Sequence, residues 1–148
     1  MIDPHVHLRD WNQQDKETIL HGLKVAKSCG FTHVFDMPNT NPAITSREVA
    51  INRLADASDA RKKVKGIFYH LYGGLTLDKS QIKEMVSLYN ELFPLVVGLK
   101  LFAGHSTGNM GIIGKEKQLS VFKALKEFGY KGVLAVHSEK EEIGRAHV

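Results

Sequence analysis

The chain has 148 residues, of which 43% are hydrophobic and 24% charged, and its formal net charge is +4. This is the composition of a globular domain that is long enough to bury a core. Its lysines are scattered, so no nucleic-acid partner is expected. No apolar run approaches the ~20 residues of a membrane span. Cys29 is the only cysteine, which excludes an intramolecular disulfide and favours the cytoplasm.

Short apolar runs rich in β-branched residues alternate with amphipathic segments. We predict strands at residues 2–8, 32–36, 64–71, 95–102 and 132–137, and helices at residues 16–29, from 45 onward, 78–93 and 115–128. Gly30 stands where a C-terminal glycine cap belongs, and Thr45 and Glu48 have the spacing of a capping box. Pro94 is expected to stop the third helix.

The alternation of five strands and four helices predicts a parallel sheet covered by helices in a single domain. The segment 103–114 interrupts this pattern, because it holds four glycines and almost no charge. We interpret it as a mobile loop at the functional site, with a long surface connection as the alternative.

Polar side chains follow the ends of several predicted strands. His5 and His7 end the first strand, Asn39 follows the second, Lys100 lies in the fourth, and His137 ends the fifth. In parallel α/β folds the carboxyl ends of the strands share one rim, where sites are built. We therefore expect these side chains to lie close together.

His5 and His7 are two residues apart, so on a strand both side chains point the same way and could bind one cation. The alternative is a strand with two solvent-facing histidines. Asp3 lies on the same face, where it could accept a proton from a histidine ring or cap a turn.

Lys100 stands in an apolar run that predicts a strand buried on both faces. Burial lowers the pKa of a lysine, and the neutral amine can add carbon dioxide to form a carbamate. A carbamate can bridge two metal ions about 3.5–4 Å apart, and His137 would then bind the second ion. The alternatives are an ion pair with a carboxylate or a stem that reaches the surface.

Four motifs occur in register along the chain. They are DPHVHLR at residues 3–9, MPNT at 37–40, GLKLF at 98–102 and VHSE at 136–139. Together they resemble the dihydroorotases of the amidohydrolase superfamily, and the likeness runs from about residue 2 to residue 140. This resemblance implies a (β/α)8 barrel with two zinc ions, of which this chain would supply about five strands of eight.

The resemblance also implies roles for single residues. His5 and His7 would bind one zinc, carboxylated Lys100 would bridge the two ions, and His137 would bind the other. Arg9 and Asn39 match positions that hold the substrate's carboxylate. The reaction would be the interconversion of N-carbamoyl-L-aspartate and L-dihydroorotate in pyrimidine synthesis.

The chain departs from the family pattern in two places. Trp11 and Asn12 stand where many relatives have Pro-Gly, so the first loop is expected to differ. A further histidine ligand and a proton-shuttling aspartate, expected on later strands, are absent, and the tail at 141–148 is unlike the family. We therefore expect residues 1–148 to form an incomplete hydrolase domain, inactive alone, whose open strand edges favour a homo-oligomer. The alternatives are a dihydropyrimidinase (hydantoinase), an allantoinase, or a non-catalytic assembly module.

Overall fold

The computed structural model describes residues 1–106 and 109–138. Five strands and four helices alternate along these residues. They are β1 (Ile2–Val6), α1 (Ile19–Ser28), β2 (His33–Asp36), α2 (Arg47–Lys63), β3 (Phe68–Gly74), α3 (Lys79–Leu92), β4 (Val96–Phe102), α4 (Lys115–Glu127) and β5 (Val133–His137). None of the helices in these described parts has the length and apolarity that a membrane crossing requires.

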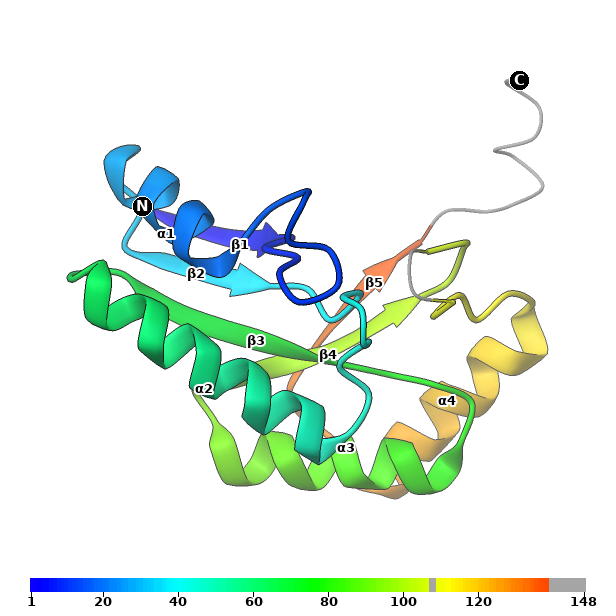
Figure 1. The fold of residues 1–148 in the computed structure, drawn as a ribbon. Helices are drawn as coiled ribbons and strands as arrows, with labels where there is room; N and C mark the ends of the chain where they lie inside the picture. The colour runs from blue at the N-terminus through cyan, green and yellow to red at the C-terminus, as the bar shows by residue number, and fades with distance from the viewer. Residues whose placement is uncertain (107–108, 139–148) are drawn as a thin grey trace.

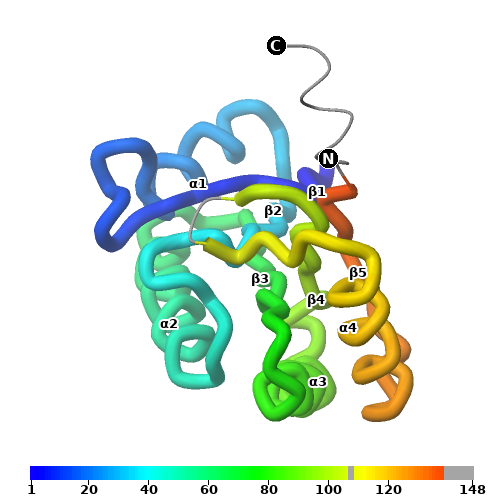
Figure 2. The backbone as a smooth tube through the Cα atoms, turned by 90° about the vertical axis from the view of Figure 1, so that its right-hand side faces the viewer, coloured from blue at the N-terminus to red at the C-terminus, as the bar shows by residue number. Residues whose placement is uncertain are grey.

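The strands form one parallel sheet in the order β1-β2-β3-β4-β5. The sheet is curled, the helices lie on its outer side, and β1 and β5 curve towards each other (Figures 1 and 2). This is part of a (β/α)8 barrel, as the sequence predicted. All five strands point the same way, so their carboxyl ends meet at one rim.

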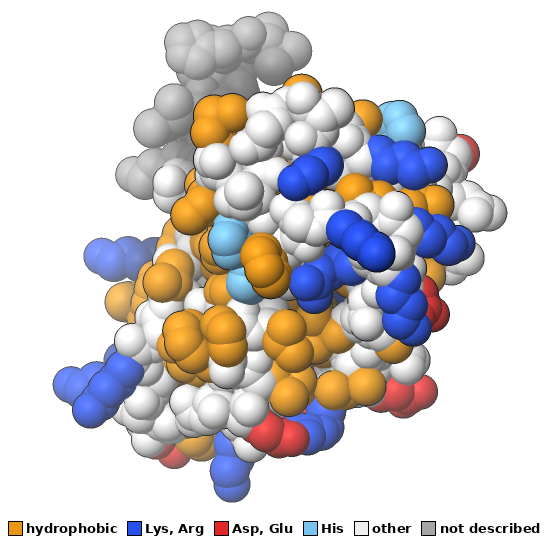
Figure 3. Space-filling view, turned by 90° about the vertical axis from the view of Figure 1, so that its left-hand side faces the viewer, with side chains coloured by type: hydrophobic (Ala, Val, Ile, Leu, Met, Phe, Trp, Pro, Cys, Tyr) orange, Lys and Arg blue, Asp and Glu red, His pale blue; other side chains and the backbone are white. Residues whose placement is uncertain are grey.

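The core lies between the outer face of the sheet and the helices. Leu23 of α1, Val34 of β2, Leu71 of β3, Met85 of α3 and Leu99 of β4 are all fully buried there. At the opposite end from the rim, where the strands begin, hydrophobic side chains are exposed among lysines and arginines (Figure 3). The two ends of the sheet therefore differ in character.

Several boundaries differ from the sequence prediction, since β1 ends at Val6 and not at residue 8, and α1 begins at Ile19 and not at residue 16. The predicted third strand began at Val64, but α2 continues to Lys63 and β3 begins only at Phe68. Val64 and Ile67 are nevertheless buried, so their apolar character reflects core packing in a turn and not strand pairing. The capping box was placed one residue early, because Ser46, not Thr45, accepts the hydrogen bond from the Val49 amide.

The expected glycine cap of the first helix is confirmed. Gly30 follows the C-cap of α1 with a φ of 83°, a left-handed conformation that glycine adopts at little cost. Part of the loop at 103–114 also folds back, since the Ile112 amide donates to the Phe102 carbonyl and Ile112 is buried. Residues 107–108 of that loop, Glu139 of the fourth motif and the tail at 141–148 lie outside the described residues.

Candidate functional site

The six residues proposed from the sequence as ligands or substrate contacts line one pocket of about 240 Å³ at the carboxyl end of the sheet. The pocket is lined by His5, His7, Arg9, Asn39, Lys100, Phe102, His105, Ser106 and His137. Its walls come from segments that are far apart in the sequence, and the curl of the sheet brings them together. Two other hollows, of about 390 and 200 Å³, contain none of these residues.

His5 on β1 and His7, which directly follows its last residue Val6, point towards the same spot, as their spacing predicted. Their Nε2 atoms are 3.2 Å apart. Two nitrogens bound to one tetrahedral zinc at ~2.0–2.1 Å would stand about 3.3 Å apart. Burial is the main cause that lowers the pKa of both rings, which favours the neutral form that binds metals. The pair is therefore spaced and protonated as two ligands of one ion would be.

Asn39 orients the second of these rings. Its Oδ1 lies 2.8 Å from Nδ1 of His7, and an amide oxygen can only accept, so Nδ1 carries the proton. The Nε2 atom of His7 is then left with its lone pair directed into the pocket. Asp3 does not contact either ring, because its carboxylate accepts the backbone amide of His5 instead. This local bond lies within β1, and the charge of Asp3 partly offsets the lowering of the His5 pKa.

Lys100 is buried on β4, with only 2% of its surface exposed. Within residues 1–106 and 109–138 no carboxylate forms an ion pair with it. Its ammonium lies 5.0 Å from the centre of the Phe102 ring. Burial lowers the pKa of Lys100, because the charged form loses its hydration. Neither alternative considered for Lys100, a paired carboxylate or a stem reaching water, is found.

His137 ends β5 and closes the pocket on the side opposite β1. It pairs with Phe102 in the parallel register, so it stands beside the end of the strand that carries Lys100. The positive charges of Lys100 and His137 both help to lower the pKa of His5. Lys100 of β4 and His137 of β5 are therefore close enough to His5 of β1 to affect its pKa.

A metal site is only partly formed by these protein groups. Within the described ranges, no cluster of three or more His, Cys, Asp and Glu side chains is arranged to hold an ion. The spacing of His5 and His7 suits one zinc, and the neutral tendency of Lys100 suits conversion into an oxygen donor. The donor set thus fits a metal, provided that Lys100 is carboxylated.

Arg9 is held near the pair of histidines. Its Nη1 donates to the Asn39 carbonyl at 2.8 Å, the one hydrogen bond of its guanidinium among residues 1–106 and 109–138. The remaining N–H groups can receive a carboxylate, for which the guanidinium fork is suited. Asn39 contributes its side chain to His7 and its main chain to Arg9, so it links these two residues of the pocket.

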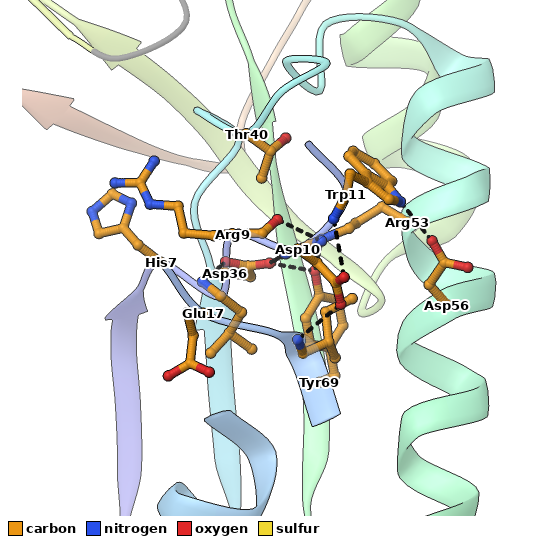
Figure 4. A network of polar contacts seen from close by, with 12 residues as sticks. His7, Arg9, Asp10, Trp11, Glu17, Asp36, Thr40, Arg53, Asp56 and Tyr69 are labelled. Carbon is orange, nitrogen blue, oxygen red and sulfur yellow. Dashed lines mark hydrogen bonds and ion pairs between the residues drawn. The ribbon is translucent and has the colours of Figure 1, made fainter. Parts of the chain in front are cut away.

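The sequence prediction missed a buried polar network beneath Arg9. Asp36 of β2, Arg53 of α2 and Tyr69 of β3 are joined there (Figure 4). A signal for it does exist, because Arg53 shares the buried face of α2 with Ala50, Ala57 and Ala60. Also missed were His105 and Ser106, which line the pocket from the loop after β4. Asn39 Nδ2 donates to Ser106 Oγ at 3.4 Å.

No family model matches the chain. Among curated proteins, a dihydroorotase of Brevibacillus brevis is 50% identical over 148 residues, which cover 97% of this chain and 30% of that protein. A dihydroorotase of Pyrococcus abyssi is 34% identical over 143 residues, which cover 97% of this chain and 29% of that protein. The chain spans about 30% of the length of these two relatives, and it resembles the N-terminal part of dihydroorotases.

Solved structures share the fold. An L-hydantoinase (dihydropyrimidinase) of Arthrobacter aurescens matches with a TM-score of 0.77 at 22% identity, covering 98% of this chain and 30% of that one. A dihydroorotase of Campylobacter jejuni matches with a TM-score of 0.66 at 20% identity, covering 95% and 38%. At these identities the likeness shows the fold, which is the partial barrel that the resemblance to dihydroorotases implied.

Proposed function

We propose that this chain provides the metal-binding and carboxylate-binding part of a cyclic amide hydrolase that interconverts N-carbamoyl-L-aspartate and L-dihydroorotate. The observation that carries the proposal is the pocket itself. Side chains from β1, β4 and β5 and from the loops after β1 and β2 meet there in the combination that this chemistry needs. Sequence similarity to dihydroorotases over nearly the whole chain supports the same substrate.

His5 and His7 would hold one zinc ion, a carbamate on Lys100 would bridge to a second, and His137 would bind that second ion. When bound, zinc would make a water molecule more acidic and polarise the ring carbonyl of the substrate. The carbamate forms when the neutral amine of Lys100 attacks carbon dioxide and loses a proton. Burial of Lys100 favours this step, because it keeps more of the amine neutral.

Arg9 and Asn39 would hold the substrate's carboxylate. Arg9 has N–H groups to spare beyond its bond to Asn39, and it lies on the same side of the pocket as His7 (Figure 4). An arginine in this place favours a substrate that carries a carboxylate, such as dihydroorotate. Dihydropyrimidinase and allantoinase substrates are the alternatives, and a comparison of ligands separates them.

The pocket lining that the structure describes contains no carboxylate that could shuttle a proton during ring opening. We therefore expect the 148-residue chain alone to bind metal and ligand but not to turn over dihydroorotate. Turnover by the purified chain at a rate typical of enzymes would contradict this expectation.

Zinc binding by the purified chain tests the metal assignment. In calorimetric titrations with zinc in bicarbonate buffer, His5→Gln and His7→Gln should each lower the affinity at least tenfold, whereas His21→Gln, on the exposed side of α1, should leave it unchanged. Carbon-13 bicarbonate should give a carbamate NMR signal that Lys100→Met removes. Zinc affinity that is equal in all variants would argue for a non-catalytic module.

Ligand choice tests the substrate. The zinc-loaded chain should bind L-dihydroorotate more tightly than dihydrouracil, which has the same ring without the carboxylate, and Arg9→Met should remove that preference. Equal or tighter binding of dihydrouracil by the unmodified chain would favour a dihydropyrimidinase.

We also propose that the chain self-associates, because β1 and β5 stand at the two ends of the strand order and each leaves one backbone edge without a neighbouring strand in the described sheet. Size-exclusion chromatography with light scattering should then show a dimer or larger species. A stable monomer would contradict this proposal.

A further inference from the structure

The segment that carries Arg9 has an unusual backbone. Arg9, Asp10 and Trp11 have φ angles of 37°, 60° and 51°, three consecutive residues in the left-handed region that side chains other than glycine rarely adopt. Such a conformation persists only where surrounding contacts hold it. The contacts around this segment therefore decide where the Arg9 guanidinium points.

Arg53 of α2 is the central contact. Its Nη1 donates to the Arg9 carbonyl at 2.9 Å. Its Nη2 and Nε donate to Oδ2 of Asp36 at 2.6 and 3.1 Å, and both side chains are fully buried. Oδ1 of Asp36 accepts the Leu8 amide at 3.0 Å. The Asp36–Arg53 ion pair thus holds the backbone at two points, the Leu8 amide and the Arg9 carbonyl.

Trp11 covers this ion pair from the outside. Its ring lies 5.0 Å from the Arg53 guanidinium carbon, and its Nε1 donates to Asp56 of α2 at 2.7 Å. Asp10 secures the other end of the segment, since its Oδ2 accepts the Ile19 amide at 2.9 Å at the start of α1. Figure 4 shows these side chains gathered between the strands and α2, with the Arg9 side chain directed away from them towards His7.

A continuous series of contacts therefore joins α2 to the histidine pair. Arg53 holds the Arg9 carbonyl, the Arg9 guanidinium holds the Asn39 carbonyl, and Asn39 Oδ1 holds His7. Arg9 is fixed at its main chain by one end of this series and at its side chain by the other. Its distance from the histidines is consequently set from two directions.

We propose that Arg53, paired with Asp36 and covered by Trp11, is a positioning residue. It sets the distance and direction of the Arg9 guanidinium from His5 and His7 to those that a carboxylate-bearing cyclic amide requires. The proposal rests on the function proposed above. It also gives a role to Trp11, whose ring covers the ion pair.

Two variants of the zinc-loaded chain test this role. Arg53→Lys keeps the positive charge but cannot reach Asp36 and the Arg9 carbonyl together, and Trp11→Ala removes the cover from a half-exposed position that the fold should tolerate. In both we expect the affinity for L-dihydroorotate to fall about tenfold, as expected when a bidentate charge-assisted contact is misaligned, with zinc affinity unchanged. The matched control is Phe93→Ala, which removes an exposed aromatic ring far from the pocket.

Amide hydrogen exchange gives a second readout that does not depend on the substrate. The Leu8 and Asp10 amides, which are hydrogen-bonded to Asp36 and Glu17, should exchange at least tenfold faster in both variants, while amides of β3 keep their protection. If Arg53→Lys does not fold, Trp11→Ala decides alone.

The outcomes separate the two proposals. Unchanged exchange at Leu8 and Asp10, or unchanged dihydroorotate affinity despite faster exchange, overturns the positioning role. A loss of zinc affinity in step with the loss of dihydroorotate affinity also overturns it, because the effect would then be general. If the unmodified chain does not prefer dihydroorotate to dihydrouracil, the proposed function fails, and faster exchange would leave Arg53 as a residue that only orders the segment.

Discussion

Two cationic side chains, Arg53 of α2 and Lys100 of β4, are buried in the described part of the chain, and their surroundings differ. Arg53 is fully buried and paired with Asp36, which also accepts a hydrogen bond from Tyr69. Lys100 is buried to nearly the same degree, yet no carboxylate in the described structure pairs with it. Burial opposes the charge of Arg53, but the carboxylate of Asp36 raises its pKa, whereas burial alone lowers the pKa of Lys100.

This difference separates a structural cation from a reactive one. The paired arginine keeps its charge and fixes the groups around it, because each of the three nitrogens of Arg53 donates a hydrogen bond. An unpaired lysine in an apolar strand is driven towards the neutral amine, which is the nucleophilic form. Arg53 thus stabilises the structure next to the pocket, whereas Lys100 is proposed to take part in the chemistry of the pocket.

Asp36→Asn should have the largest effect, because it leaves Arg53 charged, buried and without its counter-ion. We expect a loss of about 3–5 kcal/mol in the free energy of unfolding, the usual result when one partner of a buried pair is removed. Urea denaturation followed by circular dichroism measures it. Asp59→Asn, which removes an exposed ion pair with Lys62, is the matched control and should change stability little. Equal losses in the two variants would remove the distinction between the buried pair and a surface pair.

Tyr69→Phe should have a smaller effect, because Asp36 keeps Arg53 when the phenol is gone. The hydroxyl donates to Asp36 Oδ2 at 2.7 Å, and a hydrogen bond to a charged group contributes about 1.5–3 kcal/mol. The same denaturation experiment measures this loss, and zinc affinity should not change. A loss as large as that of Asp36→Asn would mean that the phenol, and not the ion pair, holds the network together.

The sequence was informative where a polar residue stands in a local pattern that makes it unusual. Lys100 stands in an apolar run, and His5 and His7 share one face of a strand, so each of these positions could be identified without knowledge of any distant residue. The fold followed from the same local patterns, since each strand and helix has its own periodicity. Hence the parallel α/β architecture and these three pocket residues could be predicted from local patterns, whereas the roles of Arg9 and Asn39 came from the resemblance, and His105 and Ser106 were missed.

The Arg53 network could not be predicted in the same way, because its meaning depends on a partner in another element. Arg53 lies in a helix with many charged residues, and only the packing of α2 on the sheet brings it to Asp36. The third strand was misplaced for a related reason, since Val64 and Ile67 are buried by neighbours that a local pattern does not reveal. Contacts between residues that are far apart in the sequence could thus not be predicted from local patterns.

Lys100→Met should have the smallest effect on stability at neutral pH, because it replaces an unpaired buried amine with an apolar side chain of similar length. We expect the free energy of unfolding to stay within about 1.5 kcal/mol or to rise. Lys83→Met, on the exposed side of α3, is the control. Comparison with Asp36→Asn then shows how an ion pair changes the contribution of a buried cation to the free energy of unfolding.

The pH dependence of stability sharpens this last prediction. The folded chain holds Lys100 with a pKa below the usual 10.5, so between that pH and the lower folded value the unfolded chain binds more protons. The stability contributed by Lys100 is therefore present above pH 10.5 and is lost as the pH falls through its folded pKa. In bicarbonate-free buffer, the difference between the unmodified chain and Lys100→Met should grow as the pH is lowered from 10.5, and Lys83→Met should show no such trend. Parallel curves for all three chains would mean that Lys100 keeps its charge when folded, and the carbamate would lose its chemical basis.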